Sequence, residues 1–151
     1  ETIKSELATF FKVLPGGMTW ANNRRGRTYD LVVSGYRDPT KINLDELNKR
    51  LSQPEYARVL TSLRDVDFSS AIDLFGTYLA QHTDVEPWLA DAQINTDKNL
   101  RLQYLAGFEY NLKKYIPLSE EIQKFRWLPP TLFTGSDETL QALFRAFKSN
   151  Q

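Results

Sequence analysis

The sequence predicts an α+β fold, in which a small, mostly antiparallel sheet of three strands is covered by about six to eight helices. Most of the chain carries apolar residues at helical spacing, interrupted by prolines and glycines. Three short stretches instead have alternating apolar and polar residues or are rich in aromatic and β-branched residues, which is typical of strands. The predicted strands are residues 18–23, 28–36 and 99–105. Because 41% of the 151 residues are hydrophobic and 13% aromatic, the chain can bury a core and is not expected to be disordered.

The first predicted element is a helix over residues 2–14, where apolar side chains recur every three or four positions. Pro15-Gly16-Gly17 ends it, since proline cannot continue a helix and glycine permits a left-handed turn. Two strands follow, joined by a loop that carries Arg24, Arg25 and Arg27. The arginines suit either a solvated hairpin loop, which we favour, or a site for phosphate or carboxylate.

Residues 37–151 are expected to form a mainly helical extension of the helix–hairpin part at 1–36, with one strand at 99–105 and the whole as one compact unit. Helix starts are predicted from capping residues. Gly107 is expected to separate the third strand from two further helices. Pro117 is expected to separate these two helices from each other. The predicted caps and starts are Asn43, Pro54, Asp67 or Ser69, Thr83 or Asp84, and Ser136.

Composition excludes several classes of site. The 19 basic and 19 acidic residues cancel, so the footprint of a nucleic-acid binder is missing. The chain has no cysteine, which excludes disulfides and thiolate sites. No glycine-rich nucleotide motif and no apolar run of the roughly 18 residues needed for membrane insertion is present. We therefore expect no nucleic-acid partner, no membrane insertion by this chain and a cytoplasmic location.

The chain offers few candidate catalytic groups, and we predict no catalytic, cofactor-binding or metal-binding residue. His82 is the only histidine and is expected at the surface, at the C-terminus of a helix. The acidic pairs at 45–46, 120–121 and 137–138 each fall in the first turn of a predicted helix, where the helix dipole favours negative charge. A small hydrolase using Asp and Ser is a weaker alternative, because no nucleophile-elbow spacing supports it.

The most distinctive segment is Asn95-Thr96-Asp97, which leads into the predicted strand at 99–105. Asn and Asp side chains close turns on their own backbone, so a structural turn is the favoured interpretation. The alternative is that Asn95, Thr96 and Asp97 face a ligand at the edge of the sheet.

This turn and strand resemble a signature near the C-terminal end of spermidine/spermine synthase-like proteins, in particular the long bacterial ones. Residues 10–20 with 30–35 look like that family's last crossover helix and hairpin, and residues 130–136 resemble a tail segment of its long members. The family's glycine-rich loop, acidic residue and catalytic aspartate have no counterpart in this sequence.

The resemblance implies a non-catalytic C-terminal region of an aminopropyltransferase-like protein of methyltransferase-like fold. The parent would be a transferase of polyamine biosynthesis that uses decarboxylated S-adenosylmethionine as co-substrate, and membrane segments outside this chain could anchor it. The partner would be the missing N-terminal half, or a second copy in a homodimer. A helix that begins at residue 2 without a leader suggests a piece of a longer protein, with a processed mature protein as the alternative.

A second hypothesis comes from a different class. The chain would be a helical protein-interaction module that uses exposed aromatic residues, with Trp88, Trp127, Phe144 and Phe147 as candidates. Burial of all four rings in one core would argue against it.

Overall fold

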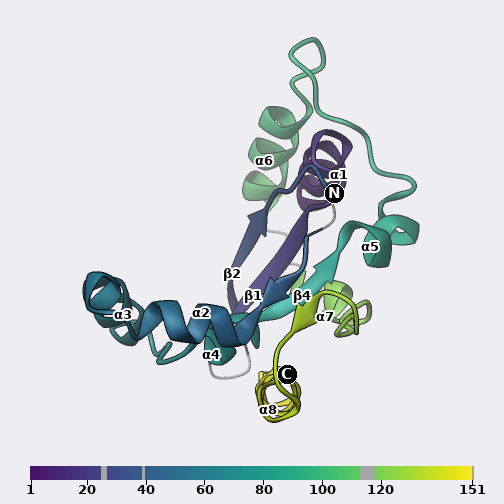
Figure 1. The fold of residues 1–151 in the computed structure, drawn as a ribbon. Coiled ribbons are helices and arrows are strands. Elements are labelled where there is room, and N and C mark those ends of the chain that lie inside the picture. Colours follow the sequence, from purple (N-terminus) through teal and green to yellow (C-terminus); the bar gives the residue numbers. More distant parts are fainter. Residues whose placement is uncertain (25–26, 39, 113–117, 151) are drawn as a thin grey trace. The chain divides into compact units, whose positions relative to one another are not determined.

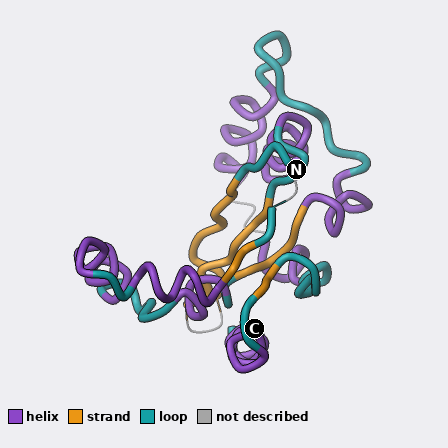
Figure 2. The backbone as a smooth tube through the Cα atoms, viewed as in Figure 1, coloured by secondary structure: helices purple, strands orange, loops and turns teal. Residues whose placement is uncertain are grey.

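The computed structural model describes residues 1–24, 27–38, 40–112 and 118–150 and confirms the α+β class. Eight α-helices, one short 3₁₀ helix and five strands occur in the described part of the chain. Helices dominate, as Figures 1 and 2 show. The predicted helix over 2–14 is α1 (Thr2–Val13), and the two strands that follow are β1 (Met18–Arg24) and β2 (Arg27–Ser34). Arg25 of the predicted loop lies outside the described residues.

The strands form two sheets. The larger has the order β2-β1-β4, where β4 is Tyr78–Gln81. The Ala21 amide donates to the Thr77 carbonyl, and the His82 amide donates to the Gly17 carbonyl, which is the descending register of an antiparallel pair. The smaller sheet pairs β3 (Ile42–Asn43) with β5 (Phe133–Thr134) in parallel.

The predicted strand at 99–105 is wrong, because these residues begin the helix α6 (Arg101–Leu112). Two asparagines stabilise its start: Asn95 Oδ1 accepts the Leu102 amide at 2.9 Å and Asn99 Oδ1 accepts the Arg101 amide at 3.1 Å. Free amides of a first helical turn need such acceptors. Gly107 lies inside α6 and does not interrupt the helix.

The third strand of the sheet is β4, which follows the helix that the sequence predicts to start at Asp67 or Ser69. That helix, α4 (Ala71–Phe75), is capped by Ser70 instead of Asp67 or Ser69, and it ends at Gly76. The next residues pair with β1, and the hydroxyl of Thr19 adds a bond to the Ala80 carbonyl at 2.9 Å. Tyr78, Leu79 and Ala80 are consequently all buried, which removes the alternation that identifies a half-exposed strand.

The chain divides into two compact units, and boundaries between them fall within strands β1, β2 and β4. Unit 1 consists of Glu1–Thr19, Val33–Pro39 and Leu79–Arg126, and unit 2 of Trp20–Val32, Thr40–Tyr78 and Trp127–Gln151. Each unit is thus assembled from three separate stretches, whereas the sequence suggested a part at 1–36 followed by a helical extension.

Unit 1 is organised around α1, which contacts α5 (His82–Leu89) and α6, as Figure 1 shows for α1 and α6. Leu7 and Phe11 form the buried face of α1. Helix α7 (Leu118–Gln123) completes the unit and buries Ile122. His82 begins α5 after β4, so its predicted place at a helix C-terminus is wrong; its ring stacks on Phe11 with centroids 5.0 Å apart.

Unit 2 contains the remaining helices. They are α2 (Leu44–Leu51), the 3₁₀ helix η1 (Pro54–Tyr56), α3 (Ala57–Arg64), α4 and α8 (Asp137–Ser149). The predicted caps Asn43 and Ser136 are confirmed, since their side chains accept the amides of Glu46 and Thr139. Helices α4 and α8 pack closely, because a Cβ on Gly76 would lie only 2.9 Å from the Ala146 Cβ.

Candidate functional site

The predicted turn at residues 95–97 is tied to its own unit by hydrogen bonds. The Asn95 amide donates to Thr9 Oγ1 of α1 at 2.8 Å, while its side chain accepts from Leu102. The Thr96 amide donates to Asn99 Oδ1 at 2.9 Å. These hydrogen bonds join α1, the turn and α6. Hydrogen bonding with backbone groups of the segment therefore explains why Asn95 and Thr96 occur there. A ligand contact by Asp97, which is exposed, stays a prediction.

The four aromatic residues proposed for partner binding lie in different surroundings. In unit 1, Trp88 is partly buried, with its ring 6.3 Å from that of Phe125 and 5.4 Å from Lys4 Nζ. In unit 2, Trp127 and Phe144 are 54% and 48% exposed, whereas Phe147 is buried. The four rings are therefore not enclosed in one core, and the condition that would argue against an interaction surface is not met.

Trp127 and Phe144 border a hollow of about 510 Å³ in unit 2, which we name the α8 groove. One wall is the segment 127–130, which contains Pro129 and Pro130, and the other is the exposed side of α8 with Leu140 and Phe144. Phe133, Leu143 and Phe147 complete the lining and are almost inaccessible to solvent. None of the described residues that line the groove is charged. Its size and apolar lining are typical of binding pockets.

The floor of the groove is continuous with an aromatic cluster in the core of unit 2. Phe133 packs edge to face against Phe75 and Tyr78, with centroids 6.0 and 5.8 Å away. Trp20 meets the same two rings at 5.3 and 5.5 Å. Edge-to-face pairs of this kind add about 0.5–1.5 kcal/mol each beyond burial. Phe133 therefore joins the base of the groove to the aromatic core of unit 2.

The α8 wall is fixed at its N-terminus by Asp45 of α2. The carboxylate of Asp45 accepts the Ser136 amide and the Thr139 hydroxyl, both at 2.6 Å. The hydrogen bond from Thr139, followed by that from the Ser136 amide, lowers the pKa of Asp45 below its usual value. A negative charge is also favourable at this end of a helix. Asp45 therefore serves the structure, and Asp137 and Glu138 lie in the first turn of α8, where the sequence predicts them.

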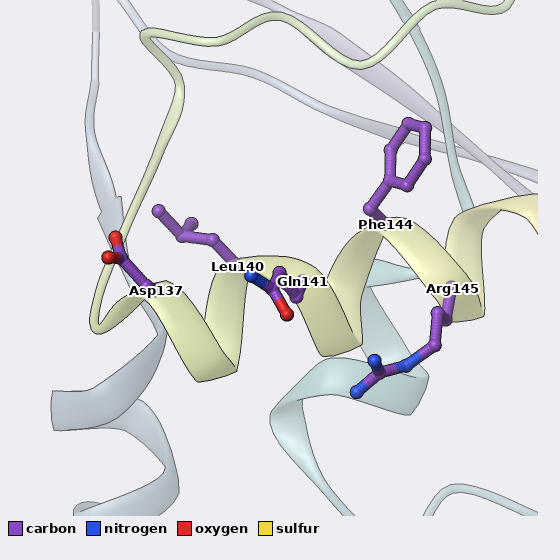
Figure 3. A pocket seen from close by; sticks show the side chains of 5 residues that line it. All are labelled: Asp137, Leu140, Gln141, Phe144 and Arg145. Carbon is purple, nitrogen blue, oxygen red and sulfur yellow. The ribbon is translucent and has the colours of Figure 1, made fainter.

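A second hollow of about 420 Å³ lies on the other side of the row formed by Leu140 and Phe144. Figure 3 shows that it runs along α8 past Gln141, with Asp137 at one end and Arg145 at the other. The Phe144 and Arg145 side chains leave α8 in different directions in this view. The row of Leu140 and Phe144 is thus flanked by one hollow with an apolar lining and by another that also has Asp137, Gln141 and Arg145 in its lining.

Sequence reasoning named three of the groove residues and missed the others. Phe133 and Leu140 follow ordinary strand and helix patterns, so nothing local distinguishes them from core residues. The Trp127-Leu128-Pro129-Pro130 segment offered a clearer signal, because consecutive prolines hold an extended backbone that cannot join a helix.

Another exposed surface does not follow from the sequence pattern, which predicts a strand where α6 lies. Leu100, Tyr104 and Phe108 lie at spacings of four residues and are 43%, 70% and 61% exposed. We name them the α6 stripe. It belongs to unit 1, and its residues line neither the α8 groove nor the hollow beside it.

Comparison of the chain with family models, curated proteins and solved structures gave no match. No group of three or more potential metal ligands occurs among the described residues. In the same part of the chain, every helix is too short or too polar to cross a bilayer.

Proposed function

We propose that this chain is a non-catalytic protein-interaction module that takes an apolar segment of a partner into the α8 groove. The observation that carries this proposal is the pairing of two half-exposed aromatic walls, Trp127 and Phe144, with a buried apolar floor. Large aromatic side chains around a hollow are the residues that dominate binding energy in protein interfaces.

The fixed geometry of the groove supports the same proposal. Its floor belongs to the Trp20, Phe75, Tyr78 and Phe133 cluster, and its α8 wall is held by Asp45. A preformed groove loses little conformational entropy when a ligand binds, so even a small contact area can give useful affinity.

Peptide display tests this function directly. The full chain is used to select from random peptides of about 16 residues, long enough for four helical turns. We expect enrichment of peptides with at least two large apolar side chains. Their affinity should fall at least about tenfold for the double variant Trp127→Ala, Phe144→Ala, because these side chains supply most of the contact.

The matched control is the double variant Tyr104→Ala, Phe108→Ala, which removes two exposed aromatic rings from the α6 stripe. It should bind the selected peptides as the unchanged chain does, and thermal unfolding should verify that both variants fold. The proposal fails if no peptide is enriched, or if the two double variants lose affinity equally.

A relationship with spermidine synthase-like proteins is a second proposal. The observation that favours it is the order of α1, β1 and β2, since a helix followed by a hairpin is what the resemblance implies for residues 1–36. The segment that carries the most specific resemblance, however, contains α6 where the family signature has a strand. On this proposal the chain lacks the nucleotide site, and calorimetry should detect no micromolar binding of S-adenosylmethionine analogues. Micromolar binding would contradict it.

A further inference from the structure

We infer that the segment accepted by the α8 groove is an amphipathic helix with acidic side chains beside its apolar face. This inference rests on the proposed function and adds the chemistry of the partner. It follows from the distribution of charge along α8 and from the backbone of the opposite wall.

Two cationic side chains lie near the Phe144 wall of the groove. Lys148 Nζ lies 4.6 Å from the centroid of the Phe144 ring, so this ammonium group stands beside the exposed aromatic wall. Arg145 lines the adjoining hollow in Figure 3 and is exposed. Within the described residues neither side chain forms an ion pair. Both remain able to pair with carboxylates of a partner.

The N-terminal end of α8 has the opposite charge. Asp137 and Glu138 occupy its first turn, and Asp45 holds its cap. Asp137 and Arg145 are separated by about 12 Å along a helix axis. A ligand with carboxylates near the C-terminal half of α8 meets cations there, whereas a basic ligand meets repulsion at the same place. Complementary charge of this kind selects partners and their orientation.

The walls favour a helical ligand over an extended one. An extended peptide depends on main-chain hydrogen bonds from a free strand edge. In the segment 127–130, Pro129 and Pro130 have no amide hydrogen, and α8 uses its own backbone bonds. A helix satisfies its backbone internally and offers side chains at spacings of three and four residues. Such a face matches the row of Leu140 and Phe144.

The experiment uses two synthetic peptides of about 16 residues with the same Leu, Phe and Trp positions on one helical face. One carries Glu at its outer positions and the other carries Gln. We expect the Glu peptide to bind the full chain about tenfold more tightly at an ionic strength of about 50 mM, and to lose this advantage at about 500 mM salt.

Charge-reversal variants locate the effect. Arg145→Glu with Lys148→Glu should remove the preference for the Glu peptide, so that the Gln peptide binds this variant at least as tightly as the Glu peptide does. The matched control, Lys49→Glu with Arg50→Glu, makes the same change in net charge at the exposed last turn of α2 and should keep the preference.

The outcomes separate the two proposals. Equal binding of both peptides, lost in the Trp127→Ala, Phe144→Ala variant, would overturn the inference and leave the proposed function standing. Binding of neither peptide would overturn both. A preference for the Glu peptide that also disappears in the Lys49→Glu, Arg50→Glu control would overturn the inference, because the charge sensed would not be that of α8. Self-association of the chain that the Glu peptide cannot displace would also overturn it, by assigning the groove to a second copy.

Discussion

Helices α6 and α8 are similar in length and both expose aromatic side chains, but the two hollows described above are lined by α8 and not by α6. Tyr104 and Phe108 of the α6 stripe are more exposed than Phe144, yet they line neither of these hollows. Phe144 instead stands next to a buried floor that a different segment of unit 2 provides. Exposure of apolar side chains by itself does not define a site. A site needs a second element that makes the surface concave.

The two helices are also held differently at their N-termini. Neutral asparagine side chains accept hydrogen bonds from the first backbone amides of α6, whereas a carboxylate from another helix accepts the hydrogen bond from the N-cap amide of α8. The α8 wall is therefore fixed to the rest of unit 2 by a charged group. The predictions that follow compare the two helices and their units.

The largest difference should come from removing one phenylalanine ring in each unit. Phe133→Ala takes away a ring that is 4% exposed and packs in the aromatic cluster, so it should lower the free energy of unfolding by about 3–5 kcal/mol. Phe108→Ala on the α6 stripe should change it by about 0.5 kcal/mol or less, since that ring is 61% exposed. Urea denaturation measures both. Equal losses would mean that the stripe is as well packed as the floor.

A smaller contrast is expected from one methyl group at two glycines. Gly76→Ala places a Cβ 2.9 Å from the Ala146 Cβ at the contact of α4 and α8, and overpacking there should cost about 1–3 kcal/mol. Gly107→Ala meets no atom within 4 Å inside α6 and should stabilise the chain by about 0.5–1 kcal/mol. The measured free energy of unfolding should therefore fall for Gly76→Ala and rise for Gly107→Ala. A stabilising Gly76→Ala would show that the α4–α8 contact can relax.

The smallest expected effect distinguishes two lowered carboxyl pKa values by their response to salt. Hydrogen bonds from Thr139 and the Ser136 amide lower the pKa of Asp45, and these donors are neutral. In unit 1, the hydrogen bond from the Lys4 ammonium, 2.7 Å away, is the largest cause that lowers the pKa of Asp91, and Coulomb attraction adds to it. Added salt should therefore raise the pKa of Asp91 toward its usual value and leave that of Asp45 nearly unchanged. NMR titration of the two carboxyl groups provides the measurement.

The sign of the pH dependence follows from the same shifts. Because folding lowers both pKa values, each carboxylate stabilises the native state above its ordinary pKa of 3.8, and this contribution disappears as the pH falls through the lowered value. Asp45→Asn should therefore flatten the acid side of the stability profile of the chain. A profile that is identical with and without this substitution would remove Asp45 as the anchor of α8.

The sequence indicated the elements whose signals are local. The apolar spacing of α1, the Pro15-Gly16-Gly17 stop and the caps Asn43 and Ser136 each depend on neighbouring residues, so they were predicted within a residue or two. Residues 99–105 misled because Leu100, Leu102 and Tyr104 alternate while Leu102 and Leu105 also fit a helix. The Asn95 and Asn99 side chains accept hydrogen bonds from the first amides of the helix and favour it, and Leu100 adopts a positive φ of 44° just before it.

By itself, the sequence determined that this chain is an α+β protein with a helix and hairpin at its start and a capped helix at its end. Only the tertiary structure decided that Tyr78–Gln81 is a strand, because β1 supplies its hydrogen-bond partners across more than fifty intervening residues. It also decided which exposed aromatic residues form a groove. A groove forms when distant segments pack together, and the spacing of residues within one segment does not reveal it.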